Sequence, residues 1–294
     1  MFINKNRRQK KSFVIPDVSG FDDSNQCFSL LRAAEAVILI ISTDGGNLRL
    51  RHCGKPSIII IAQFNLNGDI DWLGSHQATC EKALDWLIKR DSNHNGIFEM
   101  MNNNTGEEKC SDWLDIVWAS YENSFVNAQM YEALTLWANC EKILGNQSKS
   151  GYYTAIAARL KAAFNKPVEE GGFWLQEKKQ NVYWRDKDGT VHGDNLVTPV
   201  NFAAIAFGVC DDPQRIAQIL DQVERRTTKE NLFHWPLCFD SFKREEVDAG
   251  NWPFPKYENG DIFPTWGYLG IRAYAKYDKG IALRFINNIL QQYN

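Results

Sequence analysis

Hydrophobic residues recur at every third or fourth position in several long stretches of the chain, and this spacing predicts amphipathic helices. The stretches are residues 71–90, 122–145, 151–165, 213–223 and 279–293. In 151–165 the predicted buried stripe runs through Tyr152, Ile156, Leu160 and Phe164. Asp212 followed by Pro213 is typical of a helix start, because aspartate caps free N–H groups and proline suits the first turn.

Two further segments, 200–209 and 266–277, are apolar on most sides, which predicts helices enclosed by others. Short links at 145–149, 210–212 and 278–280 predict antiparallel helical hairpins. Short aromatic-rich runs at 172–176, 181–185 and 190–192 predict one small β excursion. Residues 1–69 give only weak patterns, and no linker is visible. We therefore expect an all-α fold in one domain spanning residues 1–294.

Charge and hydropathy narrow the function classes. The net charge of -3 and the lack of a basic stripe beyond residues 7–11 argue against a nucleic-acid partner. No apolar run reaches the roughly 18 residues that span a bilayer. No signal peptide is visible, so the expected location of the chain as written is cytoplasmic. The sequence indicates no oligomeric state.

Seven cysteines are scattered without metal-site or redox spacing, and they are expected to be buried free thiols.

Aromatic residues make up 13% of the chain, and many stand beside acidic, amide or glycine residues. Such neighbours suit sugar rings, which offer apolar CH faces and a rim of hydroxyl groups. The predicted substrate-binding aromatics are Trp113, Trp184, Trp235, Trp266 and Tyr257. For each of them a place in the core is the alternative. Asn127 and Asn259 are the amide candidates.

The run DSNHNGIFE, residues 91–99, has alternating oxygen-bearing side chains and a glycine that permits a sharp turn. Side chains at every second position of a tight loop can converge on one hard cation such as calcium. The twelfth position is Asn102 instead of glutamate, so the usual closing ligand of an EF-hand is missing. The alternative is an Asn- and Gly-rich connecting turn.

Asp115, in the run SDWLDIVW, is the candidate general acid. Its neighbours Trp113, Leu114 and Trp118 are apolar, and a carboxyl in such surroundings tends to keep its proton. Asp112 is the nearest rival, and it could exchange roles with Asp115 or orient it. The alternative for Asp115 is a solvated or capping aspartate.

Four runs in this order resemble the (α/α)6-barrel glycosidases, particularly the groups of amylo-alpha-1,6-glucosidases, processing alpha-glucosidases and trehalases. They are DSNHNGIFE, SDWLDIVW, YENSFVNAQMYEAL and KYENGDIFPTWGYLGIRAYAKY. The resemblance covers about residues 70–294 and implies a toroid of helical hairpins. Residues 1–69 match poorly, and about nine or ten helices are predicted where such barrels have twelve. An incomplete barrel or a truncated C-terminal end is therefore expected.

The resemblance implies a glycosidase, alpha-glucosidase-like, acting on an oligosaccharide or glycoside with inversion. Asp115 would protonate the leaving oxygen. Asp261 would activate water, because it stands closest to the family carboxylate at Asn259-Gly260, with Glu258 as the alternative. The resemblance also implies structural calcium on Asp91, Asn93, Asn95, Glu99 and the Ile97 carbonyl, and no organic cofactor.

Two other functions stay open. One is a phosphorylase or lyase on the same scaffold, for which Lys256 and His234 are the hints. The other is a sugar-binding or inactive remnant. His94, His192 and His234 show no partner spacing, and we expect surface or hydrogen-bonded histidines.

Overall fold

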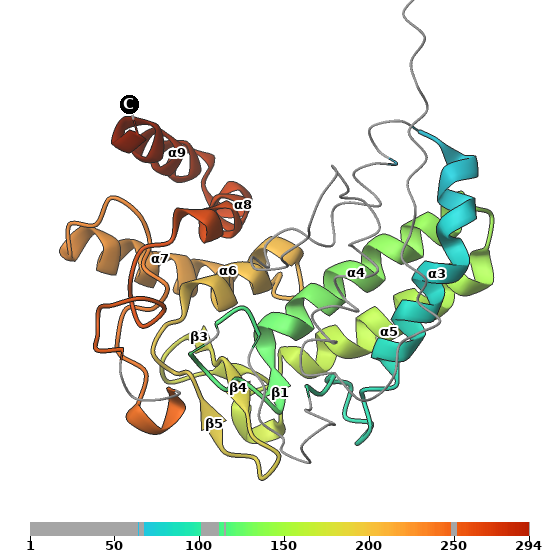
Figure 1. Ribbon diagram of the computed structural model, residues 1–294, viewed down its shortest axis with the longest axis horizontal. Helices are drawn as coiled ribbons and strands as arrows, with labels where there is room; N and C mark the ends of the chain where they lie inside the picture. Colours follow the sequence, from blue (N-terminus) through green and yellow to red (C-terminus); the bar gives the residue numbers. More distant parts are fainter. Residues whose placement is uncertain (1–63, 65–67, 101–111, 115, 248–251, 294) are drawn as a thin grey trace, which may run out of the picture.

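The computed structural model describes residues 64, 68–100, 112–114, 116–247 and 252–293. Within these ranges the fold is mainly helical, as expected (Figure 1). The helices are α3 (Ile70–Ile88), α4 (Ser124–Ile143), α5 (Gln147–Phe164), α6 (Thr198–Phe207), α7 (Pro213–Lys229), α8 (Gly267–Tyr277) and α9 (Lys279–Tyr293). Short 3-10 turns are η2 (Val168–Glu170), η3 (Arg244–Glu246) and η5 (Pro264–Trp266).

Helices α4, α6 and α8 form an inner row. Helix α4 packs against α6, and α6 packs against α8, while α5 pairs with α4 and α9 pairs with α8. Every residue of α6 is buried, including those at both ends of the helix. Helix α7 instead buries one stripe, made of Ile219, Leu220, Val223 and Thr227. The predicted contrast between enclosed and amphipathic helices is therefore confirmed for α6 and α7. It fails for α8, which was predicted to be enclosed but buries only part of its surface and exposes residues 275–277.

The spacing of hydrophobic residues predicts the buried face of α3 correctly, but the buried face of α5 is rotated from the predicted one. Helix α3 buries Leu73, His76, Cys80, Leu84 and Leu87, as predicted. Helix α5 instead buries Tyr153, Ala157, Leu160, Ala163 and Phe164, and the side chain of Tyr152 is exposed. Two of these five residues are alanines, so the face contains less hydrophobic bulk than a stripe of large residues.

The predicted β excursion lies between α5 and α6. Its strands are β2 (Trp174–Leu175), β3 (Gln180–Asn181), β4 (Trp184–Arg185) and β5 (Val191–His192), and β1 (Glu122–Asn123) pairs with β4. All these pairings are antiparallel.

Hydrogen bonds tie these strands to the starts of two inner helices. The Ser124 N–H donates to the Tyr183 carbonyl at 2.8 Å, and the Asn181 N–H donates to the Asn201 amide oxygen at 2.9 Å. Residues of the excursion therefore stand at one end of the inner row (Figure 1).

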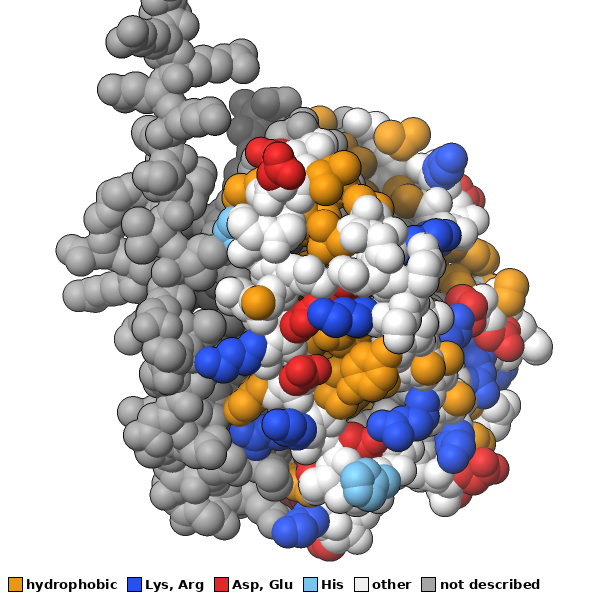
Figure 2. Space-filling model, turned by 90° about the vertical axis from the view of Figure 1, so that its right-hand side faces the viewer, with side chains coloured by type: hydrophobic (Ala, Val, Ile, Leu, Met, Phe, Trp, Pro, Cys, Tyr) orange, Lys and Arg blue, Asp and Glu red, His pale blue; other side chains and the backbone are white. Residues whose placement is uncertain are grey.

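The described surface carries mixed charge. On the face in Figure 2, basic and acidic side chains are interspersed with hydrophobic ones instead of gathered by sign. None of the described helices is both long and apolar enough to cross a membrane. Four cysteines fall in the described ranges (Cys80, Cys140, Cys210, Cys238), and all are buried and free. Burial raises the pKa of each thiol, so these thiols pack as small apolar groups.

Candidate active site

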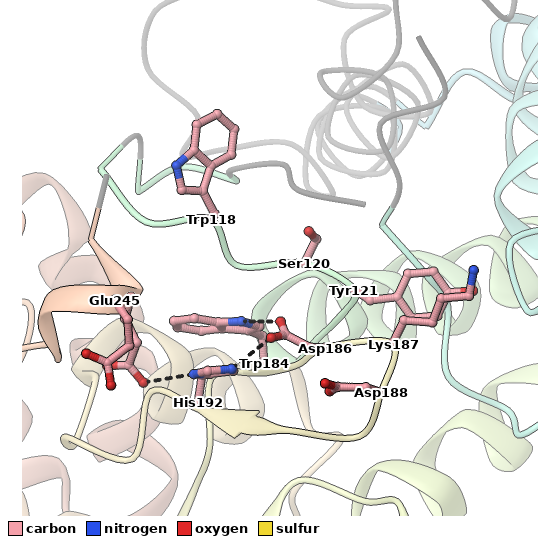
Figure 3. Close-up of a pocket in the computed structure, with 10 residues that line it drawn as sticks. Trp118, Ser120, Tyr121, Trp184, Asp186, Lys187, Asp188, His192 and Glu245 are labelled. Carbon is pink, nitrogen blue, oxygen red and sulfur yellow. Dashed lines mark hydrogen bonds and ion pairs between the residues drawn. The ribbon is translucent and has the colours of Figure 1, made fainter. Parts of the chain in front are cut away.

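A hollow of about 500 Å³ opens where the β excursion meets the segment that leads into α4 (Figure 3). Its lining combines two indoles with carboxylates, a histidine and a lysine. The lining residues are Trp118, Ser120, Tyr121, Trp184, Asp186, Lys187, Asp188, His192, Glu245 and Glu246. Aromatic surface beside convergent polar groups is typical of carbohydrate sites. Of the predicted substrate-binding residues, the hollow contains Trp184.

His192 is held between two carboxylates in the wall of this hollow. Its Nε2 lies 2.9 Å from Asp186 Oδ2, and its Nδ1 lies 3.2 Å from Glu246 Oε1. The imidazole also stacks on Trp184, with ring centroids 4.9 Å apart and planes at 13°. The hydrogen bond to the Glu246 carboxylate and the nearby charge of Asp186 raise the pKa of His192 against the opposing effect of burial. Only the imidazolium can donate to both carboxylates at once, because neutral imidazole donates through one nitrogen.

Asp112 is buried and accepts hydrogen bonds at both oxygens. Its Oδ1 accepts from the Tyr183 hydroxyl at 2.6 Å and from the Leu114 N–H at 3.0 Å. Its Oδ2 accepts from Asn123 Nδ2 at 2.8 Å, and Asn123 in turn caps the first turn of α4. Burial raises the pKa of Asp112 to about 6 despite these bonds. This carboxylate therefore connects the turn at 112–114 to Asn123 at the start of α4 and to Tyr183, which directly precedes β4.

Glu258 reaches the same segment from the C-terminal part of the chain. It is buried, and its Oε2 accepts from the Ile116 N–H at 3.3 Å. Val117, the next residue, forms an antiparallel bridge with Val247, which directly follows η3. Asp115 itself lies outside the described residues. Both residues that follow it are nonetheless held, one by Glu258 and one by Val247.

Asp261 does not line the first hollow. Its side chain is exposed and accepts from the Tyr257 N–H, closing its own turn. It lines a second hollow of about 360 Å³, which it shares with Glu230, Leu232 and Phe254 but with none of the residues that line the first hollow. The two candidates for the base are therefore separated: Glu258 contacts the segment of Asp115, and Asp261 faces another surface.

The other predicted substrate-binding residues have structural contacts. Trp113 is buried against Trp266, with centroids 4.2 Å apart, and Trp235 stacks on Tyr274 at 5.4 Å. Buried Asn127 binds the backbone of Phe98 through both polar atoms of its amide. Tyr257 lies against the Trp252 ring. Asn259 accepts from the Phe242 N–H and donates to the Trp252 carbonyl. These contacts show how each side chain is held.

The predicted calcium loop uses its oxygens within the protein. Asp91 Oδ2 accepts from the Arg159 guanidinium at 2.6 Å, and Asp91 Oδ1 accepts from the Gly96 N–H. The Glu99 carboxylate accepts from Ser92 Oγ and from the Asn93 N–H. The described residues include no group of three or more His, Cys, Asp or Glu that could hold a metal ion.

The amide groups of this loop are occupied as well. The side-chain oxygens of Asn93 and Asn95 accept N–H groups at Asn95 and Ile97, and both side-chain NH₂ groups donate to Glu122. As arranged, these residues fit the connecting-turn alternative and do not fit a calcium cage. The calcium binding expected from the sequence stays untested, and this arrangement predicts that the loop binds none.

The sequence patterns missed most of the hollow. Asp186, Asp188 and His192 flank the predicted turn at Asp188-Gly189, and that cluster of acids around a hairpin was the available signal. His192 is hydrogen-bonded as expected. His234 is not: both ring nitrogens are buried without a partner, and burial lowers its pKa to about 4.

The described helices pair in hairpins, and the hollow lined by indoles and carboxylates lies where the chain enters α4. This arrangement is consistent with a helical domain of the six-hairpin type. The model of the bacterial alpha-L-rhamnosidase 6 hairpin glycosidase domain matches residues 54–235, and the chain belongs to this family. The expected six-hairpin glycosidase fold is thereby confirmed. The expected alpha-glucosidase-like specificity is not supported, because the family is one of rhamnosidases.

Two solved structures are similar in fold. One is the crystal structure of a GH78 family rhamnosidase of Bacillus sp. GL1, with 14% identity and a TM-score of 0.52, covering 77% of this chain and 19% of that one. The other is a sialidase, with 14% identity and a TM-score of 0.53, covering 95% of this chain and 27% of that one. The chain thus spans about a fifth to a quarter of these proteins, and such identities show the fold alone. No curated protein sequence matches the chain.

Proposed function

We propose that the chain carries the site of a glycoside hydrolase, at the hollow and the adjoining segment 112–118. The observation that carries this proposal is the contact between Glu258 and Ile116. It brings a buried carboxylate to the residue next to Asp115. Glycosidases of both stereochemical types use such a pair of carboxyl groups on either side of the scissile bond.

In this proposal Asp115 is the general acid and Glu258 is the base. Asp115 protonates the departing oxygen, and Glu258 activates water from the opposite face of the sugar, with inversion. Glu258 replaces Asp261 as the first choice, because Asp261 closes its own turn at the other hollow. Asp112 acts as a positioning residue, since both its oxygens already accept hydrogen bonds from the protein. The names of the family and of the GH78 structure make an α-L-rhamnoside the first substrate to test.

The experiment compares three variants on aryl α-L-rhamnosides with good and poor leaving groups. Asp115→Asn should lose the substrate with the poor leaving group and partly keep the activated one, because a good leaving group needs the proton less. Glu258→Gln should lose both, since each needs activated water. Asp261→Asn is the matched control and should keep both. Loss of both substrates in Asp261→Asn with full activity in Glu258→Gln would return the base to Asp261.

Sugar binding without hydrolysis is the second candidate function. The observation that favours it is that Glu258, the proposed base, is buried and already accepts a hydrogen bond from the Ile116 N–H. Binding without turnover on every glycoside tested would select this alternative.

A further inference from the structure

We propose that His234 is a positioning residue for the segment 112–118, and that it serves in this role only while its imidazole is neutral. Uptake of a proton by this ring loosens the start of α8 and, through it, the placement of the segment. The inference rests on the proposed function, because it takes residues 112–118 as the place of the general acid. It adds a control of that segment by pH, which the family and the two similar structures do not assign.

Two glycines of α8 let the rings of His234 and Trp235 lie directly on the helix backbone. A Cβ at Gly267, the first residue of α8, would stand 2.5 Å from Cε1 and 2.6 Å from Nε2 of His234. A Cβ at Gly270 would stand 2.4 Å from the Trp235 ring. These glycines share one face of the helix, because residues i and i+3 are neighbours on a helix surface. The His234 ring therefore limits how the start of α8 can lie.

The His234 ring is enclosed by apolar groups. It is 1% exposed, and neither ring nitrogen has a hydrogen-bond partner. The ring centroid of Trp235 lies 4.5 Å away, and that of Phe285 in α9 lies 6.1 Å away. A phenylalanine would fill such a place without the cost of two unbonded nitrogens, so packing alone does not account for a histidine here.

An added proton on this ring meets no acceptor. Imidazolium has N–H donors at both nitrogens and a full charge, and burial without an acceptor penalises both. Burial lowers the pKa of His234 to about 4, and a backbone group of Trp235 opposes this only in part. No charged group among the described residues contributes to the shift. Ionisable side chains of the surrounding elements are bonded elsewhere: Glu230 to Arg226, Arg272 to Glu132, Tyr274 to the Leu220 carbonyl and Arg284 to Glu224.

Trp266 connects the start of α8 to the segment 112–118. It directly precedes Gly267, and its ring centroid lies 4.2 Å from that of Trp113. Phe125 of α4 completes this aromatic group, 5.6 Å from Trp113 and 6.0 Å from Trp266. A charged His234 that displaces the start of α8 therefore also displaces the ring against which Trp113 packs.

Hydrogen exchange followed by mass spectrometry tests this coupling without turnover. When the start of α8 opens to water, His234 regains its ordinary pKa of 6.5, against about 4 when buried. The opened state takes up the proton more readily, so opening is favoured as pH falls through this range. From these two values, opening becomes about 30-fold more favourable at pH 5 than at pH 7.5.

The variant His234→Phe is the reference, because it keeps a flat ring against Gly267 and cannot take up a proton. Each exchange rate is divided by the rate of this variant at the same pH, which removes the intrinsic rate and the titration of Asp112 and other groups. The ratio should rise about 30-fold from pH 7.5 to pH 5 in peptides that contain Trp266 and in peptides that contain Leu114 and Ile116. It should stay constant in peptides of α5. His234→Leu is a second reference without a titrating side chain.

His94→Asn is the matched control. His94 is exposed and has a positive φ, which asparagine accepts, so this variant should show the same rise as the original protein. A ratio that does not change with pH would overturn the proposal. So would a rise at Trp266 without one at Leu114 and Ile116, or an equal rise in α5, which would show unfolding of the whole domain. Hydrolysis of 4-nitrophenyl α-L-rhamnoside is measured in parallel, and its absence at every pH would count against the proposed function alone.

Discussion

Replacing Asp112 by asparagine tests how the turn before Asp115 is held. The buried carboxyl of Asp112 has a pKa of about 6 in the folded protein against an ordinary value of 3.8, and burial is the main cause. Between these two values the folded state binds more protons than the unfolded state. The free energy of unfolding contributed by Asp112 therefore falls as pH rises through this window.

The size of the effect follows from the pKa difference. At about 1.4 kcal/mol per pKa unit, the shift from 3.8 to about 6 corresponds to about 3 kcal/mol. Asp112→Asn removes this titration. The variant should also lose stability at every pH, because its NH₂ group would face the NH₂ group of Asn123, which now donates to Asp112. The stability advantage of the original protein over the variant should therefore shrink by most of these ~3 kcal/mol between about pH 4 and pH 7.

Urea unfolding followed by tryptophan fluorescence measures this advantage at each pH. Asp188→Asn is the control with the opposite sign. Hydrogen bonds from Thr190 lower the pKa of Asp188, so its contribution is present above the ordinary aspartate range and is lost as pH falls. An Asp112→Asn difference that stays constant across the window would refute the reasoning that burial dominates this carboxyl.

Three further predictions concern the hollow and its supports. His192→Gln should cost stability below the ordinary histidine pKa, and the cost should vanish as pH rises through the raised pKa of His192; thermal unfolding from about pH 5 to pH 9 checks this. Gly193→Ala should lower the free energy of unfolding in urea by more than about 2 kcal/mol, because the added Cβ would stand 2.3 Å from the Cβ of Tyr183. Gly145→Ala is the control: Gly145 also has a positive φ but lies in open space, so this variant should cost about 1 kcal/mol. Calorimetric titration with calcium should show no heat at the loop of Asp91, whose carboxylate pairs with Arg159; heat that Asp91→Ala abolishes would restore the calcium assignment.

Helix positions could be predicted from the sequence because burial of large side chains at helical spacing leaves a clear pattern. Helix α3 buries the five predicted residues. The shifted face of α5 shows the limit, because two of its buried residues, Ala157 and Ala163, add little hydrophobic bulk to the pattern. The hydrogen-bond partners of helix α4 were not predicted either. Its buried polar residues, such as Asn127 and Glu132, find partners in the folded chain that sequence spacing does not indicate.

The site was harder to predict because its contacts also join residues that are distant in the sequence. Trp184 was found by its acidic and aromatic neighbours. The arrangement around His192 depends on Glu246, which is distant in sequence and reaches it only after the strands pair and η3 folds. Glu258 could be named from the Asn259-Gly260 motif, but its choice over Asp261 required knowing which of the two faces the segment of Asp115.

The contacts also show which parts of the chain the proposed site requires. Asp112 is held by Asn123 and Tyr183, which lie inside the span 54–235 matched by the family model. The restraints on residues 116 and 117 come from Glu258 and Val247, which lie beyond that span. His192 connects the two sets, because its second carboxylate, Glu246, directly precedes Val247. The wall of the hollow and the segment beside Asp115 are thus linked through consecutive residues. A change in the charge of His192 should therefore affect the placement of the acid-bearing segment as well as the hollow that it lines.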